Sequence, residues 1–376
     1  MSISELAAEI RRTTMSSNEI DNELSYITDD TLLIPSGSVM LNLACSDHYR
    51  GAFTTGKMVN LIGDSSSGKS FMAFTMLAQI AYDDLFADYR LIYDDVEQAC
   101  DFDIAKLFGD NFASRLEAPA NEKDGSPIYS DTIQDFHMHI FDALEYTDDD
   151  NNKKPFIYVL DSFDALTSRE EKETADKNIK ALRANKKAAG SYGMEKPKIL
   201  GQILRMIVSG MKESKSFLLI ISQTRDNISV MSFSKKTRSG GRALKFYASH
   251  EIWLASRGKI NKTTKGVERV IGTDVQAKVT KNKLTGKLRD ADYPIYYDYG
   301  IDDIGPCVEF LVDTGFWDVR KQTIIATDFD LEATQAKLIK HIEGKDQEQK
   351  LFAMAEKQWQ TIENAVKLTR KSKFGK

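Results

Sequence analysis

Residues 63–70 read Gly63-Asp64-Ser65-Ser66-Ser67-Gly68-Lys69-Ser70. A short apolar run, Met58–Ile62, comes before this stretch, and a helical pattern, Phe71–Tyr82, follows it. The pattern is GxxxxGK[ST] between a strand and a helix, where the glycines let successive backbone N–H groups face one anion and the helix N-terminus adds its positive dipole end. The stretch therefore predicts a phosphate-binding loop that contacts a nucleotide along its whole length, rather than an accidental glycine-serine turn.

Two side chains of this loop and one carboxylate further along the chain indicate how the phosphates are held. Lys69 is expected to reach the β- and γ-phosphates, and Ser70 to place its hydroxyl on Mg²⁺. Asp161 ends the apolar run Phe156–Leu160, where a carboxylate holds Mg²⁺ through its waters. An aspartate at that place could also cap the next loop, so its assignment depends on Lys69. Together they predict an ATP and Mg²⁺ site.

The remaining apolar runs indicate the fold around this loop. Each is short and continuous, as in strands that are buried on both faces of a parallel sheet, and helical stretches lie between them. We therefore expect an α/β fold of the P-loop ATPase class, with a mainly parallel central sheet flanked by helices and functional residues at the carboxyl ends of the strands. The expected elements are strands at Leu91–Tyr93, Phe217–Ser222, Glu251–Ser256, Val275–Thr280 and Tyr293–Tyr299, and a helix at Ile199–Met211.

Composition restricts the class of protein. The chain is 41% hydrophobic and 28% charged, as in ordinary globular proteins, and no apolar run approaches the ~20 residues of a membrane span. The three cysteines (Cys45, Cys100 and Cys307) form no CxxC pair, which argues against structural zinc and favours a reducing compartment. With no signal-like N-terminus, we expect a cytoplasmic protein.

Three regions are expected along the 376 residues. Residues 1–33 form a polar, acidic segment with apolar positions at helical spacing, which predicts a short helix that packs on its own domain or on a neighbouring subunit. Residues 34–327 are expected to form the ATPase core with its DNA-binding loops. Residues 328–376 predict a small helical region that ends in a basic tail. The apolar positions of the first helix are Ile3, Leu6 and Ile10.

Hydrolysis also needs a group that orients or deprotonates the attacking water. Asp94, Asp95 and Glu97 all follow the Leu91–Tyr93 run, at the same edge of the expected sheet. Residue chemistry alone leaves all three as candidates, and Asp94 or Asp95 could be loop carboxylates without a catalytic role.

A basic, flexible segment follows the Phe217–Ser222 run, although the net charge of the chain is −5. Such a segment can follow a phosphate backbone, and its apolar side chains can stack on or insert between bases. The alternative is a solvated basic loop. A second cationic stretch, Lys177–Lys198, contains Met194 and is in part the solvated face of a helix. The predicted DNA-binding residues are Met194, Arg225, Met231, Phe233, Lys235, Lys236, Arg238, Ser239, Gly240, Gly241, Arg242 and Lys245.

Several separate stretches resemble the RecA-like recombinase family, bacterial RecA and its bacteriophage relatives, from about Ile34 to Trp317. They are Ile34–Ser38, the GDSSSGKS loop, Asp95–Asp101, Asp161-Ser162, Gln223, Gly240–Ser249 (GGRALKFYAS) and Lys281-Asn282-Lys283. The resemblance implies that Glu97 is the catalytic carboxylate and that Gln223 senses the γ-phosphate and relays it to the DNA-binding loop. It implies that Lys281 and Lys283 complete the ATP site of the neighbouring subunit, and that Asp101 accepts from the adenine amino group.

The chain departs from the family in three places. Ile104 stands where the family has an aromatic residue stacked on adenine, the first DNA-loop region after Leu166 is longer than in bacterial RecA, and the C-terminus is basic instead of acidic. The resemblance implies a DNA-dependent ATPase that forms filaments on single-stranded DNA and pairs it with homologous duplex DNA. The alternatives are a ring-forming motor or helicase on the same core, and a non-catalytic mediator of recombination.

Overall fold

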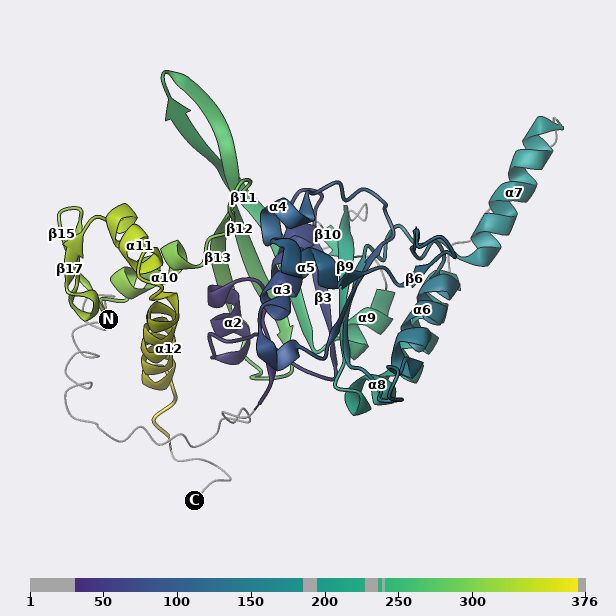
Figure 1. The fold of residues 1–376 in the computed structure, drawn as a ribbon, viewed down its shortest axis with the longest axis horizontal. Helices are drawn as coiled ribbons and strands as arrows, with labels where there is room; N and C mark the ends of the chain where they lie inside the picture. Colours follow the sequence, from purple (N-terminus) through teal and green to yellow (C-terminus); the bar gives the residue numbers. More distant parts are fainter. Residues whose placement is uncertain (1–30, 185–194, 227–235, 239–240, 371–376) are drawn as a thin grey trace.

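A computed structural model of the chain describes residues 31–184, 195–226, 236–238 and 241–370. A ten-stranded sheet crosses the molecule, with the order β14-β13-β12-β11-β3-β9-β8-β4-β5 and with β10 paired to β9 (Figure 1). Its strands are β3 (Lys57–Gly63), β4 (Arg90–Asp95), β5 (Leu116–Glu117), β8 (Phe156–Asp161), β9 (Phe217–Asp226), β10 (Lys236–Arg238), β11 (His250–Thr264), β12 (Val267–Asn282), β13 (Asp290–Tyr296) and β14 (Gly300–Ile301).

The centre of the sheet is parallel, as the continuous apolar runs predicted. Strand β3 lies between β11 and β9, and β8 lies between β9 and β4, all in parallel register. All six residues of β8 are buried, because helices cover both of its faces. The predicted α/β class is therefore confirmed. The strands β12, β13 and β14 add an antiparallel end to the sheet, which the sequence patterns did not distinguish from the rest.

Helices form one layer on each face of the sheet (Figure 1). Side chains of α2, α3, α4 and α5 share one apolar cluster with one face, and those of α6 and α8 share a second cluster with the other. Helix α7 (Arg169–Arg183) projects from the core and has no buried residue. The covering helices are α2 (Val39–Ser46), α3 (Lys69–Ala81), α4 (Ile104–Phe108), α5 (Asp110–Arg115), α6 (Ile133–Glu145), α8 (Glu195–Glu213) and α9 (Gly241–Tyr247).

Strands β11 and β12 are much longer than predicted. They pair along their length and extend beyond the sheet as a hairpin that stands away from the rest of the molecule (Figure 1). The expected strands Glu251–Ser256 and Val275–Thr280 are only the buried parts of this hairpin, because its outer half is exposed and polar and carries no apolar run. The remaining short elements are β1 (Leu33–Ile34), β2 (Phe53–Thr54), β6 (Ala120–Asn121), β7 (Pro127–Ile128) and the 3₁₀ turn Asp84–Phe86.

A C-terminal unit packs beside α2 around an apolar cluster that also includes Val39 and Leu43 of that helix. The predicted boundary at 327/328 lies between β16 and β17, which pair with each other, so we propose that the unit begins at α10 instead. Its helices include the predicted C-terminal ones, but its small sheet was not predicted. The elements are α10 (Ile304–Asp313), β15 (Asp318–Arg320), β16 (Thr323–Ala326), the 3₁₀ turn Thr327–Phe329, β17 (Leu331–Ala333), α11 (Gln335–Glu343) and α12 (Glu348–Ala365).

An ionic cluster joins α12 to the core. The Arg289 guanidinium lies 2.7 Å from a carboxylate oxygen of Asp47 and 2.5 Å from one of Glu363, and it stacks over the ring of Trp359. Arg289 is only 12% exposed and the two carboxylates are about one-fifth exposed. Lys287 contacts the same two carboxylates from a more exposed position. The cluster fixes the C-terminal unit against α2.

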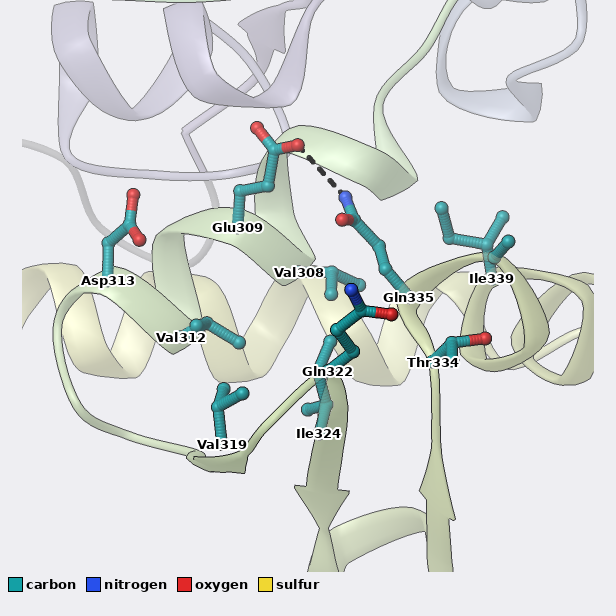
Figure 2. A pocket seen from close by; sticks show the side chains of 11 residues that line it. Val308, Glu309, Val312, Asp313, Val319, Gln322, Ile324, Thr334, Gln335 and Ile339 are labelled. Carbon is teal, nitrogen blue, oxygen red and sulfur yellow. Dashed lines mark hydrogen bonds between the residues drawn. The ribbon is translucent and has the colours of Figure 1, made fainter.

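The C-terminal unit also contains a hollow of about 590 Å³, lined by α10, α11 and β16. Val308, Val312 and Ile324 point toward it, and Gln335 Nε2 donates a hydrogen bond to Glu309 Oε1 across its rim at 2.9 Å (Figure 2). None of its lining residues belongs to the predicted nucleotide or DNA sites. The hollow is therefore separate from the phosphate loop.

Two predictions for the chain termini lie outside the described residues. They are the helix in residues 1–30 and the last part of the basic tail, residues 371–376. Within the described ranges, no helix has the length and the apolar character that a membrane span requires.

Candidate nucleotide site and nucleic-acid interface

The phosphate loop leaves β3 at Gly63 and enters α3 at Lys69. A Cβ on Gly63 would collide with Ser67 and would lie 2.7 Å from the backbone oxygen of Leu254. Gly68 has φ +89°, in the left-handed region that glycine adopts without strain. The backbone of the loop therefore requires glycine at both positions that the motif specifies.

Lys69 lies inside the loop and is only 7% exposed. Its Nζ donates a hydrogen bond to the backbone oxygen of Asp64 at 2.6 Å. Burial lowers the pKa of this lysine, and the nearby carboxylates of Asp161, Glu97 and Asp64 act in the opposite direction. The ammonium group thus lies where backbone N–H groups and the N-terminus of α3 converge, as a phosphate ligand requires.

Ser70 and Asp161 meet at the same edge. Ser70 Oγ donates to Asp161 Oδ2 at 2.5 Å, and the hydroxyl of Tyr93 donates to the same oxygen at 2.7 Å. Burial raises the pKa of the Asp161 carboxyl, and these two hydrogen bonds oppose the rise. A hydroxyl and a carboxylate oxygen that converge beside a phosphate loop are ligands that Mg²⁺ prefers, so the residues fit the predicted ion.

The three candidate carboxylates at the end of β4 have different surroundings. Asp94 is fully buried on the face of the sheet opposite to α3, where Ser130 and Tyr158 donate hydrogen bonds to it. Asp95 accepts the N–H of Cys100 at 3.2 Å. Of the three, Glu97 accepts side-chain hydrogen bonds from residues at the ends of two other strands of the parallel sheet.

Glu97 Oε1 accepts two hydrogen bonds from those strand ends. Ser162 Oγ, just after β8, donates at 2.5 Å, and Gln223 Nε2, in β9, donates at 2.8 Å. The backbone N–H of Gln223 donates to Asp164 Oδ2 at 2.6 Å, which fixes its position from a third side. The residues that the sequence predicted as catalytic carboxylate and as sensor therefore contact each other directly.

The predicted DNA-binding segment continues from Gln223. Strand β9 carries Arg225 and turns back through β10, in which Arg238 pairs with Thr224. The hydroxyl of Thr224 also donates to the side chain of Asp64 in the phosphate loop. The predicted residues Lys236 and Arg238 lie in β10, and Gly241, Arg242 and Lys245 lie in α9. Those at Met194, Met231, Phe233, Lys235, Ser239 and Gly240 fall outside the described residues.

Lys281 and Lys283 lie at the opposite edge of the sheet. Lys281 pairs with Glu251, and Glu251 pairs with Asn60 in the middle of β3. Asn60 precedes Gly63 by three residues, or about 10 Å along a strand. The Nζ atoms of both lysines donate to backbone oxygens at the end of α9, Lys283 to that of Phe246 at 3.2 Å. Within one subunit, these lysines are therefore not brought to the phosphate loop.

On the side of the site where adenine is predicted to bind, the side chains are more exposed than those around the phosphate loop. Asp101 is exposed, and Ile104 begins α4 and packs partly on the apolar cluster of α3. Phe102, between them, is 43% exposed and meets Phe71 of α3 edge to face. On the other side of the loop, β13 ends beside Tyr297, which is 51% exposed. The exposed ring of Phe102 thus stands beside α3, next to the positions Asp101 and Ile104 where the sequence predicted a base without an aromatic partner.

Some residues of the site were not predicted. Tyr93, which contacts Asp161, and Asp164, which holds Gln223, carried no motif. The only signal in the sequence was position: Tyr93 lies two residues before Asp95 in a strand, and thus on the same face of the sheet, while Asp164 follows the strand that ends in Asp161.

Comparison with known proteins agrees with this geometry. A family model described as the RecA N-terminal domain matches residues 151–302. The Streptomyces coelicolor protein named Protein RecA is 30% identical over 294 residues, which are 77% of this chain and 66% of that protein. The Nocardioides sp. protein of the same name is 30% identical over 292 residues and is covered to 71%, and the Caulobacter vibrioides protein is 27% identical over 286 residues and is covered to 69%.

The alignment thus spans just under two thirds of the Streptomyces protein and somewhat more of the other two. The matched model covers β8, β9 and the hairpin, and so includes Asp161, Gln223 and the two lysines of the opposite edge. With this identity over most of its length, the chain belongs to the RecA-like recombinase family.

Proposed function

We propose that this protein is a DNA-dependent ATPase that assembles as a helical filament on single-stranded DNA and promotes pairing and strand exchange with homologous duplex DNA. It would act in recombination and DNA repair in the cytoplasm of a bacterium or a phage-infected cell, where its three free cysteines stay reduced. The proposal rests on family membership together with the contacts at the carboxyl edge of the sheet.

In the proposed reaction, the phosphate loop holds ATP through its backbone N–H groups and Lys69. Ser70 and Asp161 would hold Mg²⁺, which neutralises charge on the phosphate oxygens when it is bound. Glu97 orients the attacking water and accepts its proton. Ser162 and Gln223 both donate to Glu97, which keeps one of its oxygens directed along the sheet edge.

The contact between Gln223 and Glu97 is the observation that carries the proposal. Gln223 lies in the strand that leads directly into the basic segment, and its amide reaches the proposed catalytic carboxylate at 2.8 Å. A shift of that segment on binding DNA would move Gln223 and so change the position of Glu97. The arrangement supplies a physical reason for hydrolysis that depends on DNA.

The DNA interface would be formed by the cationic segment from Arg225 to Lys245. Lysine and arginine side chains neutralise phosphates whatever the base sequence, so we expect binding that weakens with salt and shows little base preference. Met231, Phe233 and Met194 would insert between bases or stack on them. A sharply sequence-specific footprint would contradict this part of the proposal.

The test is ATP turnover with and without single-stranded DNA, with electron microscopy of the same samples. We expect stimulation by DNA, filaments and not rings, and loss of turnover in Lys69→Ala. Glu97→Gln should bind ATP but hydrolyse it about 10²-fold more slowly or worse, as removal of a general base does. Glu122→Gln, a change at an exposed carboxylate, serves as the control.

Each outcome decides between the candidate functions. Rings would favour the motor, and an inactive ATP-binding protein would favour the mediator. Parental turnover in Glu97→Gln would show that the wrong carboxylate was assigned. Turnover that is indifferent to DNA would overturn the recombinase proposal as a whole.

A further inference from the structure

Asp94 is a buried carboxylate that the proposed reaction does not use. It is fully buried in β4, and its side chain lies on the face of the sheet opposite to Tyr93, because successive side chains of a strand alternate. It accepts the N–H of Ser130 at 2.8 Å, the hydroxyl of Ser130 at 2.6 Å and the hydroxyl of Tyr158 at 2.6 Å. The hydroxyl oxygen of Ser130 also lies 2.9 Å from Nδ1 of the buried His139, so a histidine stands behind the serine that holds this carboxylate.

A carboxylate is a costly residue at such a place. Burial raises the pKa of Asp94, and the three hydrogen bonds from Ser130 and Tyr158, together with a smaller electrostatic contribution from His139, oppose that rise. An apolar side chain of similar size would cost less in a sheet whose neighbouring residues are Ile92 and Leu160. Buried polar groups of this kind are retained where they specify one arrangement of the chain. The question is which arrangement Asp94 specifies.

On one side, Asp94 lies next to the catalytic segment. Glu97 follows three residues later, and the turn between them is held by the N–H of Val96, which donates to the backbone oxygen of Asp161 at 2.8 Å. The side chain of Val96 packs on the same apolar cluster that surrounds Asp94. A displacement of the end of β4 toward or away from this cluster therefore displaces Glu97.

On the other side, Ser130 lies next to the root of the first DNA-loop region. The backbone oxygen of Asp131 accepts the N–H of Thr167 at 3.1 Å, and the backbone oxygen of Thr167 accepts the N–H of Ile133 at 2.8 Å. The carboxylate of Asp131 also pairs with Lys172 in the first turns of α7. Residues 130–133 are thus joined to the start of the helix that projects toward solvent (Figure 1).

We propose that Asp94 and Ser130 form a positioning link that couples the root of α7 to Glu97, so that DNA held at the first loop region changes hydrolysis by a route separate from Gln223. The inference rests on the proposed function, since it concerns the DNA dependence of that reaction. Asp94 does not touch the reacting atoms. It acts through the end of β4.

Two hydroxyls on the same carboxylate provide a matched pair of variants. Ser130 and Tyr158 are both buried and both donate to Asp94 Oδ2 at 2.6 Å. Ser130 precedes Asp131, which contacts Thr167 and Lys172 at the start of α7, whereas Tyr158 lies in the middle of β8, ten residues before the N-cap of α7 at Ser168. Ser130→Ala should lower the ratio of turnover with poly-dT to turnover without it by about tenfold, the worth of one hydrogen bond to a charged group. Turnover without DNA and ATP affinity should not change. Tyr158→Phe should keep the ratio within about twofold of the wild-type value. This variant also loses one hydroxyl hydrogen bond to Asp94, but Tyr158 makes no described contact with the start of α7.

Contact continuity alone does not establish coupling, so a double-mutant cycle is required. Asp94→Asn should lower the same ratio, and Asp94→Asn combined with Ser130→Ala should lower it no further. Equal effects of Ser130→Ala and Tyr158→Phe, or additive effects in the double variant, would overturn the link. Melting temperatures of the single variants separate a loss of coupling from a loss of fold.

Hydrogen exchange without DNA distinguishes a failure of this inference from a failure of the proposed function. Ser130→Ala should speed exchange of the amides at 167–172 and at 96–97, and Tyr158→Phe should not. Unchanged exchange at either end would refute the link whatever the activity. Wild-type turnover that ignores DNA would refute the proposed function, and the exchange measurement would still decide whether the link exists.

Discussion

The assignment of Lys281 and Lys283 to the neighbouring subunit's ATP site can be tested by mixing two inactive proteins. Both lysines stand about 10 Å of strand away from the phosphate loop of their own subunit, at the other edge of the sheet. If they act in trans, the pair Lys281→Glu with Lys283→Glu should lower turnover about a thousandfold, the lower end of what a cation supplied in trans contributes to phosphoryl transfer.

The expected recovery follows from the arrangement. A competent interface needs an intact Lys69 from one subunit and intact lysines from the next. In a filament mixed equally and at random, the subunit that provides the phosphate loop is the charge-reversal variant, with its intact Lys69, in about half of the interfaces. Independently, the subunit that provides the two lysines is Lys69→Ala, with both lysines intact, in about half of the interfaces. About one quarter of the head-to-tail interfaces are then complete, and turnover should recover to about one quarter of the wild-type value.

The assay is steady-state release of phosphate on poly-dT, with the two variants mixed before DNA is added. A double charge reversal at Lys259 and Lys262, on the exposed outer part of the hairpin, controls for the change in net charge and should keep normal turnover. Electron microscopy must show that the two proteins assemble together. Mixed filaments with no more activity than the separate variants would refute action in trans, as would normal hydrolysis by the charge-reversal variant alone.

Two predictions concern stability. Arg289→Met should cost about 3 kcal/mol in urea unfolding, near the lower end for breaking a buried ion pair, because Asp47 and Glu363 lose a cation that is 12% exposed. Lys287→Met should cost under about 1 kcal/mol, since Lys287 is 40% exposed. Equal losses of stability in the two variants would contradict the central role of Arg289 in the ionic cluster. Burial lowers the pKa of His250 to about 4, so the folded protein keeps this ring neutral while the unfolded chain takes up a proton below its ordinary pKa of 6.5. The free energy of unfolding should therefore fall by about 3 kcal/mol between pH 6.5 and pH 4. In His250→Asn this pH dependence should be absent. The same slope against pH in the variant would refute the role given to His250.

The sequence predicted the centre of the molecule well, because its signals there are local. A strand that is buried on both faces needs a continuous apolar run, and the phosphate loop needs glycine where the backbone leaves no room for a side chain. Gly63, Lys69 and Asp161 could therefore be placed at one edge without knowledge of the strand order.

The choice among the three carboxylates shows where local signals end. Strand alternation implies that Asp94 and Asp95 point in opposite directions, but it does not tell which face carries α3 and the nucleotide. That information comes from packing: Tyr93 stacks on Phe74 of α3, so its side of the strand is the nucleotide side. Only with this contact can Asp94 be placed on the face of the sheet that lies away from α3.

The boundary of the C-terminal unit could not be predicted for a different reason. Its strands β15, β16 and β17 are three or four residues long, too short for an alternating pattern to stand out from chance. The unit is held together by contacts between α10 and α12, which are far apart in sequence. The helical pattern from residue 328 therefore predicts a separate segment, whereas the apolar cluster of the unit also contains Ile304 and other residues of α10.

The division of charged groups between the two edges of the sheet has a consequence for how hydrolysis is controlled. One edge carries the phosphate loop and Glu97, and the other carries the two lysines. If the lysines act in trans, as proposed, a single subunit holds two incomplete halves that head-to-tail stacking would join, and a head-to-tail contact that does not close generates a filament. Turnover per subunit should then rise with protein concentration even when ATP is saturating. Under the proposed function, the contact of Gln223 with Glu97 would add DNA as a second requirement, acting within the subunit.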